Sequence, residues 1–169
     1  MSFESEFPEM KPPIDKLDLR ILSFLQTDGR ITNQALADKV GLSPSSCLQR
    51  VKRLEQQGYI SQYLSQINLA KVCRYVTCIA TVKMRNHTPQ DFDDFAALVA
   101  TVHEIIECST VSGECDFILK IVCRDMSRHL ELNNFLLNSS KKIESINTHV
   151  VMKENKQFSS FPLKTLIEN

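Results

Sequence analysis

The segment from Thr32 to Gly58, TNQALADKVGLSPSSCLQRVKRLEQQG, constrains the fold of this chain more than any other stretch. Apolar residues on one side of its first half predict a helix that ends at Gly41, because glycine accepts the left-handed backbone of a helix end. Ser43 and Pro44 then predict a second helix, as its N-cap and its first residue. Two short helices separated by about three residues that include a glycine are typical of a helix-turn-helix motif.

The second helix of the motif, residues 44–57, has two unlike sides when successive residues are spaced by about 100°. Its apolar positions share one side, which we expect to face the core: Cys47, Leu48, Val51 and Leu54. Gln49 and Arg53 lie opposite the core and Arg50 lies at the border, whereas the one carboxylate, Glu55, lies near the core edge. Side chains of these kinds bind phosphates and purine edges, so the outer side predicts contact with DNA. The predicted DNA-contacting residues are Ser43, Ser45, Ser46, Gln49, Arg50, Lys52 and Arg53.

The charge distribution agrees with this interpretation, although the formal net charge of the whole chain is zero. Lys39, Arg50, Lys52 and Arg53 are basic, and no acidic residue lies between the first and the last of them. A local basic surface on a neutral chain is typical of a DNA-binding module attached to a body that does not bind DNA. The alternative is a solvated helix side, which usually carries charges of both signs.

Length and composition indicate a soluble protein of one domain or two small ones, because the chain has 169 residues and no apolar run near the eighteen or so that span a bilayer. Residues 1–13 are acidic and contain prolines, so we expect a flexible arm rather than a signal peptide, and hence a cytoplasmic protein without a membrane partner. The cysteines lack the spacing of metal sites and are expected to be unpaired thiols: Cys47, Cys73, Cys78, Cys108, Cys115 and Cys123.

Before the motif, a helix is predicted to begin near Asp15 and to end at Asp28 and Gly29, with its apolar residues in one stripe. Together with the motif it forms a three-helix domain over residues 14–60. The apolar, β-prone residues that follow predict an extended linker over residues 61–73.

From residue 74 onwards the hydrophobic period changes from helical spacing to alternation, which predicts a strand over residues 74–84 with Val76, Cys78, Ala80 and Val82 on one side. The remaining elements predict the order β-α-β-β-α-β of a ferredoxin-like unit over residues 74–169. The first of them is a helix that begins at Thr88 and Pro89 and has an apolar stripe of Phe92, Phe95, Ala96 and Val99. A strand over 103–111, a turn at 112–114 and a strand over 116–123 follow it. A helix over 125–137 with a wide apolar surface and a strand over 145–152 complete the unit.

From Ile14 to about Leu163 the chain resembles the Lrp/AsnC family of feast/famine regulators. Four blocks carry the resemblance: DKLDLRILSFLQTDGRITNQALADKVGLSPSSCLQRVKRLEQQGYI, EIIECSTVSGECDFILKI, RDMS and THVVMKENK. The resemblance implies an α+β protein with a winged-type helix-turn-helix domain joined to a ferredoxin-like effector-binding and oligomerisation domain. It implies double-stranded DNA as a partner, a small effector, usually an amino acid, in place of a cofactor, and homodimers that assemble into tetramers or octamers. It also implies a bacterial or archaeal cytoplasm, at the nucleoid when bound to DNA.

The resemblance places the effector between dimers, with the family's loop glycine on Gly113 and its aspartate on Asp116. Backbone N–H groups in a glycine turn can hold a carboxylate, and Asp116 either pairs with the ammonium of an amino acid or fixes the turn; an ordinary hairpin turn is the third interpretation. Cys115 and His149 depart from the family's pattern, so the effector is open between leucine and a sulfur-containing or polar amino acid. The implied effector-binding residues are Val111, Ser112, Gly113, Glu114, Cys115, Asp116, Met126, His149, Val150 and Val151.

The sequence leaves two alternatives to a DNA-binding regulator, an enzyme and an amino-acid sensor. An enzyme would draw on Cys115, Asp116, His103, His129 and His149, but the chain has no nucleophile–base motif, no metal-ligand spacing and only four glycines, so we expect no catalytic or metal-binding residues. The second alternative is an amino-acid sensor that acts through protein partners with little direct DNA readout. The intact cap of the second motif helix and its basic side argue against that alternative.

Overall fold

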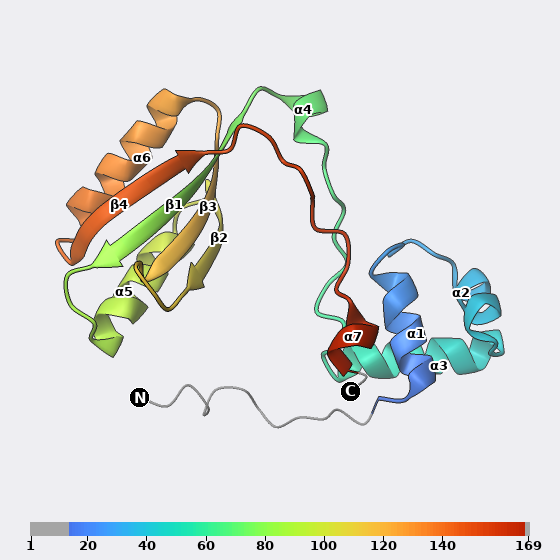
Figure 1. Cartoon of the computed structure of the whole chain (residues 1–169). Helices are drawn as coiled ribbons and strands as arrows, with labels where there is room; N and C mark the ends of the chain where they lie inside the picture. Colours follow the sequence, from blue (N-terminus) through green and yellow to red (C-terminus); the bar gives the residue numbers. More distant parts are fainter. Residues whose placement is uncertain (1–13, 168–169) are drawn as a thin grey trace. The chain divides into compact units, whose positions relative to one another are not determined.

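The computed structural model describes residues 14–167, and Figure 1 shows the succession of its helices and strands. The predicted arm over residues 1–13 lies outside the described residues. Contacts divide the described residues into two compact units, one with residues 14–66 and 156–167, the other from Ile67 to Asn155. Among the described helices, none combines the length and the apolar character that crossing a membrane requires.

Three helices form the body of the first unit: α1 (Lys16–Leu25), α2 (Asn33–Val40) and α3 (Pro44–Gln56). The start of α1 is held by a capping box, in which the Asp15 carboxylate accepts the Asp18 N–H at 2.9 Å and the Asp18 carboxylate accepts the Asp15 N–H at 3.0 Å. The predicted start of this helix near Asp15 is therefore confirmed, as are the predicted helix end at Gly41 and the predicted cap at Ser43.

The core of the first unit is built by all three helices, and its buried residues are Ile21, Leu36, Ala37, Val40, Cys47 and Leu54. One residue of α3 that was expected in this core is not there, since Leu48 is 42% exposed. The packed row of α3 consists of Cys47, Val51 and Leu54. Leu48 lies about 100° around the helix from Cys47, which places it beyond the edge of the contact with α1 and α2.

The linker and the C-terminal segment differ from the division of the chain predicted from sequence. Within the predicted linker, residues 61–68 have no helix or strand, but a short helix, α4 (Leu69–Val72), follows them. The C-terminal segment groups with the first unit, although residues 74–169 were assigned to one domain. The amide of Gln26 donates to the carbonyl oxygen of Phe161 and accepts its N–H, both at 2.9 Å, and α7 (Leu163–Ile167) contacts α1. These contacts hold the segment against the first unit.

Besides the short α4, a four-stranded antiparallel sheet with two longer helices forms the second unit. In chain order the elements are β1 (Val76–Met84), α5 (Pro89–Ala100), β2 (Ile105–Thr110), β3 (Phe117–Cys123), α6 (Met126–Ser139) and β4 (Ile143–Val150). The strands lie in the order β2-β3-β1-β4, so the chain follows the predicted ferredoxin-like topology.

The two longer helices of the second unit, α5 and α6, cover the same face of the sheet. Phe95 and Val99 of α5 and Leu132 and Leu136 of α6 join one cluster with alternate residues of β1 and β3, which confirms the predicted inner side of β1. Ala96 is exposed, although it was placed in the apolar stripe of α5. The wide apolar surface predicted for α6 is only partly covered, because Leu132 and Leu136 face the sheet while the flanking apolar residues lie outside that contact: Met126, Leu130, Phe135 and Leu137.

Candidate functional site

The turn between α2 and α3 is determined by three residues at helix ends. Thr32 caps α2 through its hydroxyl, which accepts the Ala35 N–H at 3.2 Å. Gly41 ends α2 in the left-handed conformation, with φ 75° and ψ 39°, which costs a residue with a side chain more than it costs glycine. Ser43 caps α3 by accepting the Ser46 N–H at 3.3 Å. The direction in which α3 leaves the turn is therefore determined by residues within the turn and at the helix ends.

A side-chain bond also ties the beginnings of the two helices together. The amide nitrogen of Asn33, the first residue of α2, donates to the carbonyl oxygen of Pro44, the first residue of α3, at 2.8 Å. Together with the buried Cys47 and Leu54, this bond fixes the N-terminal end of α3 against α2. The geometry of the helix-turn-helix motif is thus held at both ends of the turn.

Three exposed serine hydroxyls gather at the N-terminal end of α3. The Ser43 hydroxyl lies 2.9 Å from that of Ser46 and 3.2 Å from that of Ser45. The N-terminal end of a helix carries partial positive charge, and hydroxyls can donate to an anion. A DNA phosphate is the kind of group that this cluster can bind.

Further along α3, Gln49 and Lys52 are exposed on the side away from the core. Neither of them has an ion pair or a side-chain hydrogen bond within residues 14–167. Glu55 is also exposed, but its carboxylate accepts the Tyr63 hydroxyl at 2.9 Å. Gln49 and Lys52 therefore face solvent, and their donor groups have no side-chain partner within residues 14–167.

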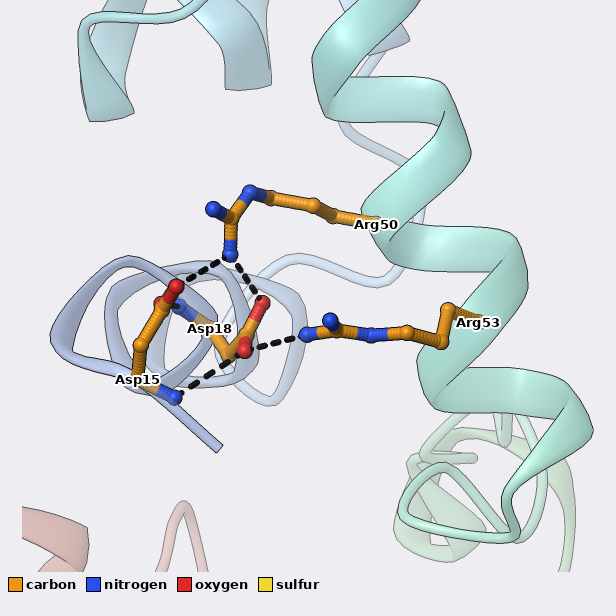
Figure 2. A network of polar contacts seen from close by, with 4 residues as sticks. All are labelled: Asp15, Asp18, Arg50 and Arg53. Carbon is orange, nitrogen blue, oxygen red and sulfur yellow. Dashed lines mark hydrogen bonds and ion pairs between the residues drawn. The ribbon is translucent and has the colours of Figure 1, made fainter. Parts of the chain in front are cut away.

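Arg50 and Arg53, predicted as DNA contacts, point toward α1 (Figure 2). Nη1 of Arg50 lies 2.6 Å from Oδ2 of Asp15 and 2.8 Å from Oδ1 of Asp18, and Nη2 of Arg53 pairs with Oδ2 of Asp18. The side chain of Asp18 is completely buried, whereas those of Arg50 and Arg53 are 27% and 43% exposed. The periodicity of α3 puts the Cα of Arg53 opposite the core, but its long side chain bends back to a carboxylate of α1, which is 35 residues away and invisible to the periodicity of α3.

These ion pairs shift the pKa values of two of the groups. The hydrogen bonds that Arg50 donates to Asp15 and Asp18 raise its pKa above the usual range. The backbone N–H of Asp18 and the Arg50 guanidinium lower the pKa of the Asp15 carboxyl. Both shifts favour the charged forms, so the pair of Arg50 and Asp15 is fully ionised at neutral pH.

The loop between β2 and β3 contains the predicted effector residues Val111–Asp116. Gly113 has φ 122°, a conformation that favours glycine. The Asp116 carboxylate is 13% exposed, accepts the Met84 N–H at 2.7 Å and lies 3.1 Å from Nε2 of His87. The backbone of Asp116 also bonds to Val82 and Val111. Asp116 therefore fastens the loop to the end of β1.

The remaining predicted effector residues lie elsewhere on the sheet. Met126 begins α6 just after the far end of β3, and the Val151 N–H bonds to Thr77 at the start of β1. His149 pairs with Ile79 in the middle of the sheet. The seven residues of β3 span about 20 Å and separate the Asp116 end from the Met126 end. A single chain therefore does not bring the predicted effector residues together.

The pockets of the second unit do not coincide with these residues either. One lies between α5 and β2 and is lined in part by Ala96, Ile106 and Cys108, and another lies beside Arg128 and Glu131. Neither is lined by any residue predicted to bind the effector.

The sheet separates two of the histidines that a catalytic site would draw on, His129 and His149. His129 is buried on the helix-covered face, where its Nε2 lies 3.1 Å from the Thr148 hydroxyl and where burial lowers its pKa. His149 follows Thr148 in β4 and hence lies on the other face. Residues 14–167 contain no group of three or more histidine, cysteine or acidic side chains that could hold a metal ion. The six cysteines are free thiols.

Known proteins match both units. The sequence model of a winged helix-turn-helix DNA-binding family matches residues 14–61, and that of the Lrp/AsnC ligand binding domain matches residues 77–161. The chain is 38% identical over 152 residues to the leucine-responsive regulatory proteins of Salmonella typhimurium and Escherichia coli, which covers 90% of this chain and 93% of each of those proteins.

Solved structures agree with the sequence matches. A Neisseria meningitidis transcriptional regulator in complex with L-Met superposes with a TM-score of 0.83 at 34% identity, over 90% of this chain and 99% of that one. An AsnC family transcriptional regulator from Agrobacterium tumefaciens superposes with a TM-score of 0.83 at 26% identity, over the same shares of the two chains.

Proposed function

The chain belongs to the Lrp/AsnC family, and from this premise we propose that it controls transcription by placing the exposed side of α3 in the DNA major groove under the control of an amino acid bound by its second unit. The matched family and relatives are DNA-binding and regulatory proteins, and we propose that this chain acts as a regulator rather than as an enzyme. We further place its activity in the cytoplasm of a bacterium or archaeon, at the nucleoid when DNA is bound.

The observation that carries the proposal is the exposed edge of α3, which we define as Ser43, Ser45, Ser46, Gln49 and Lys52. The serine hydroxyls at the helix N-terminus suit phosphate oxygens, Gln49 can form a bidentate bond with an adenine edge, and Lys52 supplies a cation. The turn that presents this edge is fixed by the caps and by the Asn33–Pro44 bond. The edge is therefore preorganised on a rigid motif.

The open face of the sheet supports assembly into dimers. Ile79, Ile118 and Val122 project from it among polar side chains, and no helix of this unit covers it. A second copy of the chain that packs on this face would place two α3 helices on one DNA molecule. We propose a homodimer that binds two half-sites spaced by one helical turn or a multiple of it, with tetramers or octamers formed from such dimers.

For the effector, the turn at Gly113 offers backbone N–H groups to a carboxylate, while Asp116 holds the turn in place. Met126 and Val151 lie at the far end of the sheet, so we propose that one copy of the chain supplies the loop and a neighbouring copy supplies the apolar side of the same site. The names of the relatives point to leucine and L-Met. Both amino acids have apolar side chains that are not branched at Cβ and are suited to contact with Met126.

Two measurements test the proposal. Fluorescence anisotropy with a duplex from the protein's own promoter region, compared with a scrambled duplex at two salt concentrations, is expected to give tighter binding to the promoter. Equal binding to both duplexes at every salt concentration would instead support a sensor that acts through protein partners. A thermal-shift screen of the twenty amino acids identifies the effector, because a ligand that binds only the folded state raises Tm.

A further inference from the structure

One carboxylate lies at the centre of the polar network between α1 and α3 (Figure 2). Oδ1 of Asp18 accepts from Arg50 at 2.8 Å, and its Oδ2 accepts the Asp15 N–H at 3.0 Å and pairs with Arg53. The Asp18 side chain has no exposure to solvent. A buried carboxylate is strongly unfavourable unless it is paired and hydrogen-bonded, so this arrangement requires the two arginines.

The network holds α3 in one rotation about its axis. Arg50 and Arg53 lie three residues apart on one flank of α3, and Asp15 and Asp18 lie three residues apart at the start of α1. The apolar contacts of Cys47, Val51 and Leu54 are non-directional, whereas the ion pairs have preferred directions and distances. The ion pairs therefore determine which side chains of α3 face away from the domain.

The exposed edge defined above lies next to this flank, on the side of α3 away from the core. Ser45, Gln49 and Lys52 are spaced by four and three residues and share one side of the helix. The two arginines face Asp15 and Asp18, so their charges are offset within the protein. Lys52 is then the cation of α3 that has no acidic partner within residues 14–167.

We infer that Asp18 is a positioning residue for DNA recognition, which keeps Arg50 and Arg53 off the DNA and sets the rotation of α3 so that Ser45, Gln49 and Lys52 form the contacting edge. This inference rests on the proposed DNA contact of α3. It divides the basic residues of one helix into two that hold the helix and one that binds phosphate.

The test measures the salt dependence of DNA binding, because each lost phosphate contact flattens the slope of log K against log salt by about 0.9. We expect Lys52→Gln to flatten the slope by about 0.9 per subunit. The matched variant Arg53→Gln, one residue away, is expected to leave the slope unchanged while it lowers the preference for the promoter duplex over the scrambled duplex. Full-length protein is used, and circular dichroism establishes that each variant is folded.

Asp18→Asn is expected to change the salt slope in the direction opposite to that of Lys52→Gln. Without the buried charge, Arg53 loses its carboxylate partner and is released to phosphate, whereas Arg50 keeps Asp15. The slope therefore steepens by about 0.9 per subunit and binding to scrambled DNA tightens. The preference for the promoter duplex falls by roughly fivefold or more, which is the discrimination that one good base contact supplies.

The outcomes separate this inference from the proposed function. If Arg53→Gln and Lys52→Gln flatten the slope equally, the arginines contact DNA and the inference is wrong, while the DNA-contacting helix stands. If Lys52→Gln has no effect and the wild type shows no preference, the proposed edge fails and the inference fails with it. If Asp18→Asn does not fold, the comparison of Arg53→Gln with Lys52→Gln alone decides.

Discussion

Replacing Asp116 separates the two roles that the sequence leaves open for its carboxylate. In Asp116→Ala the Met84 N–H loses its acceptor, although Met84 is completely buried. An unsatisfied buried donor costs about 1–3 kcal/mol, and the loss of the partner of the largely exposed His87 adds at most about 1 kcal/mol. Asp116→Ala is therefore expected to lower the free energy of unfolding by about 1–4 kcal/mol.

Asp116→Asn is the matched control, because the asparagine carbonyl oxygen can still accept the Met84 N–H. We expect it to cost less than about 1 kcal/mol. Urea unfolding of the full-length protein at one fixed protein concentration measures both variants, because the stability of an oligomer depends on concentration.

The two variants also report on the effector. If Asp116 fixes the turn, Asp116→Asn retains the rise in Tm that the amino acid causes, whereas Asp116→Ala loses most of it. If the carboxylate pairs with the ammonium group, both variants lose the rise. Equal unfolding free energies of Asp116→Ala and the wild type would refute the structural role.

Three further predictions concern the other contacts of the fold. Hydrogen bonds from Lys142 lower the pKa of Asp91 from its ordinary value of 3.8. The pair therefore stabilises the fold above pH 3.8, and this stabilisation is lost as the pH falls below that value. Urea unfolding is expected to show a smaller drop in the free energy of unfolding for Lys142→Ala than for the wild type when the pH is lowered from about 5 to about 2. Gln26→Ala removes both bonds to Phe161 and is expected to speed hydrogen exchange of the C-terminal segment in mass spectrometry, while a surface substitution at Gln49 is not. Ser43→Ala removes the cap of α3 and is expected to cost about 0.5–2 kcal/mol in unfolding, whereas Ser43→Asp, which keeps an acceptor, costs less.

Much of the fold could be predicted because its determinants are local. The ends of α2 and α3 depend on Thr32, Gly41 and Ser43, which cap or terminate helices through residues at most four positions away. The alternation in β1 likewise reports its inner face directly, since successive side chains of a strand point to opposite faces. Such features require no knowledge of the rest of the chain.

Contacts between distant residues account for what the sequence did not predict. Asp18 carries the local pattern of a capping box, but its arginine partners are 32 and 35 residues away. The return of Phe161 to Gln26 crosses 135 residues. The apolar residues of α6 that stay exposed look like core residues in the sequence, because periodicity cannot distinguish a face that packs within the chain from one left open at its surface.

The division of charge on α3 bears on how an effector in one unit can control DNA binding by the other. A single helix with one unpaired lysine supplies one phosphate contact from a charged side chain, so one subunit binds DNA weakly. Joining two subunits turns the second contact into an intramolecular event and raises affinity without any change in α3. If the amino acid binds between copies of the chain, as we propose, it needs to change only their assembly. On our inference, the ion pairs around Asp18 then keep the contacting edge constant, so that the effector sets how much DNA is bound while the edge sets which DNA sequence is preferred.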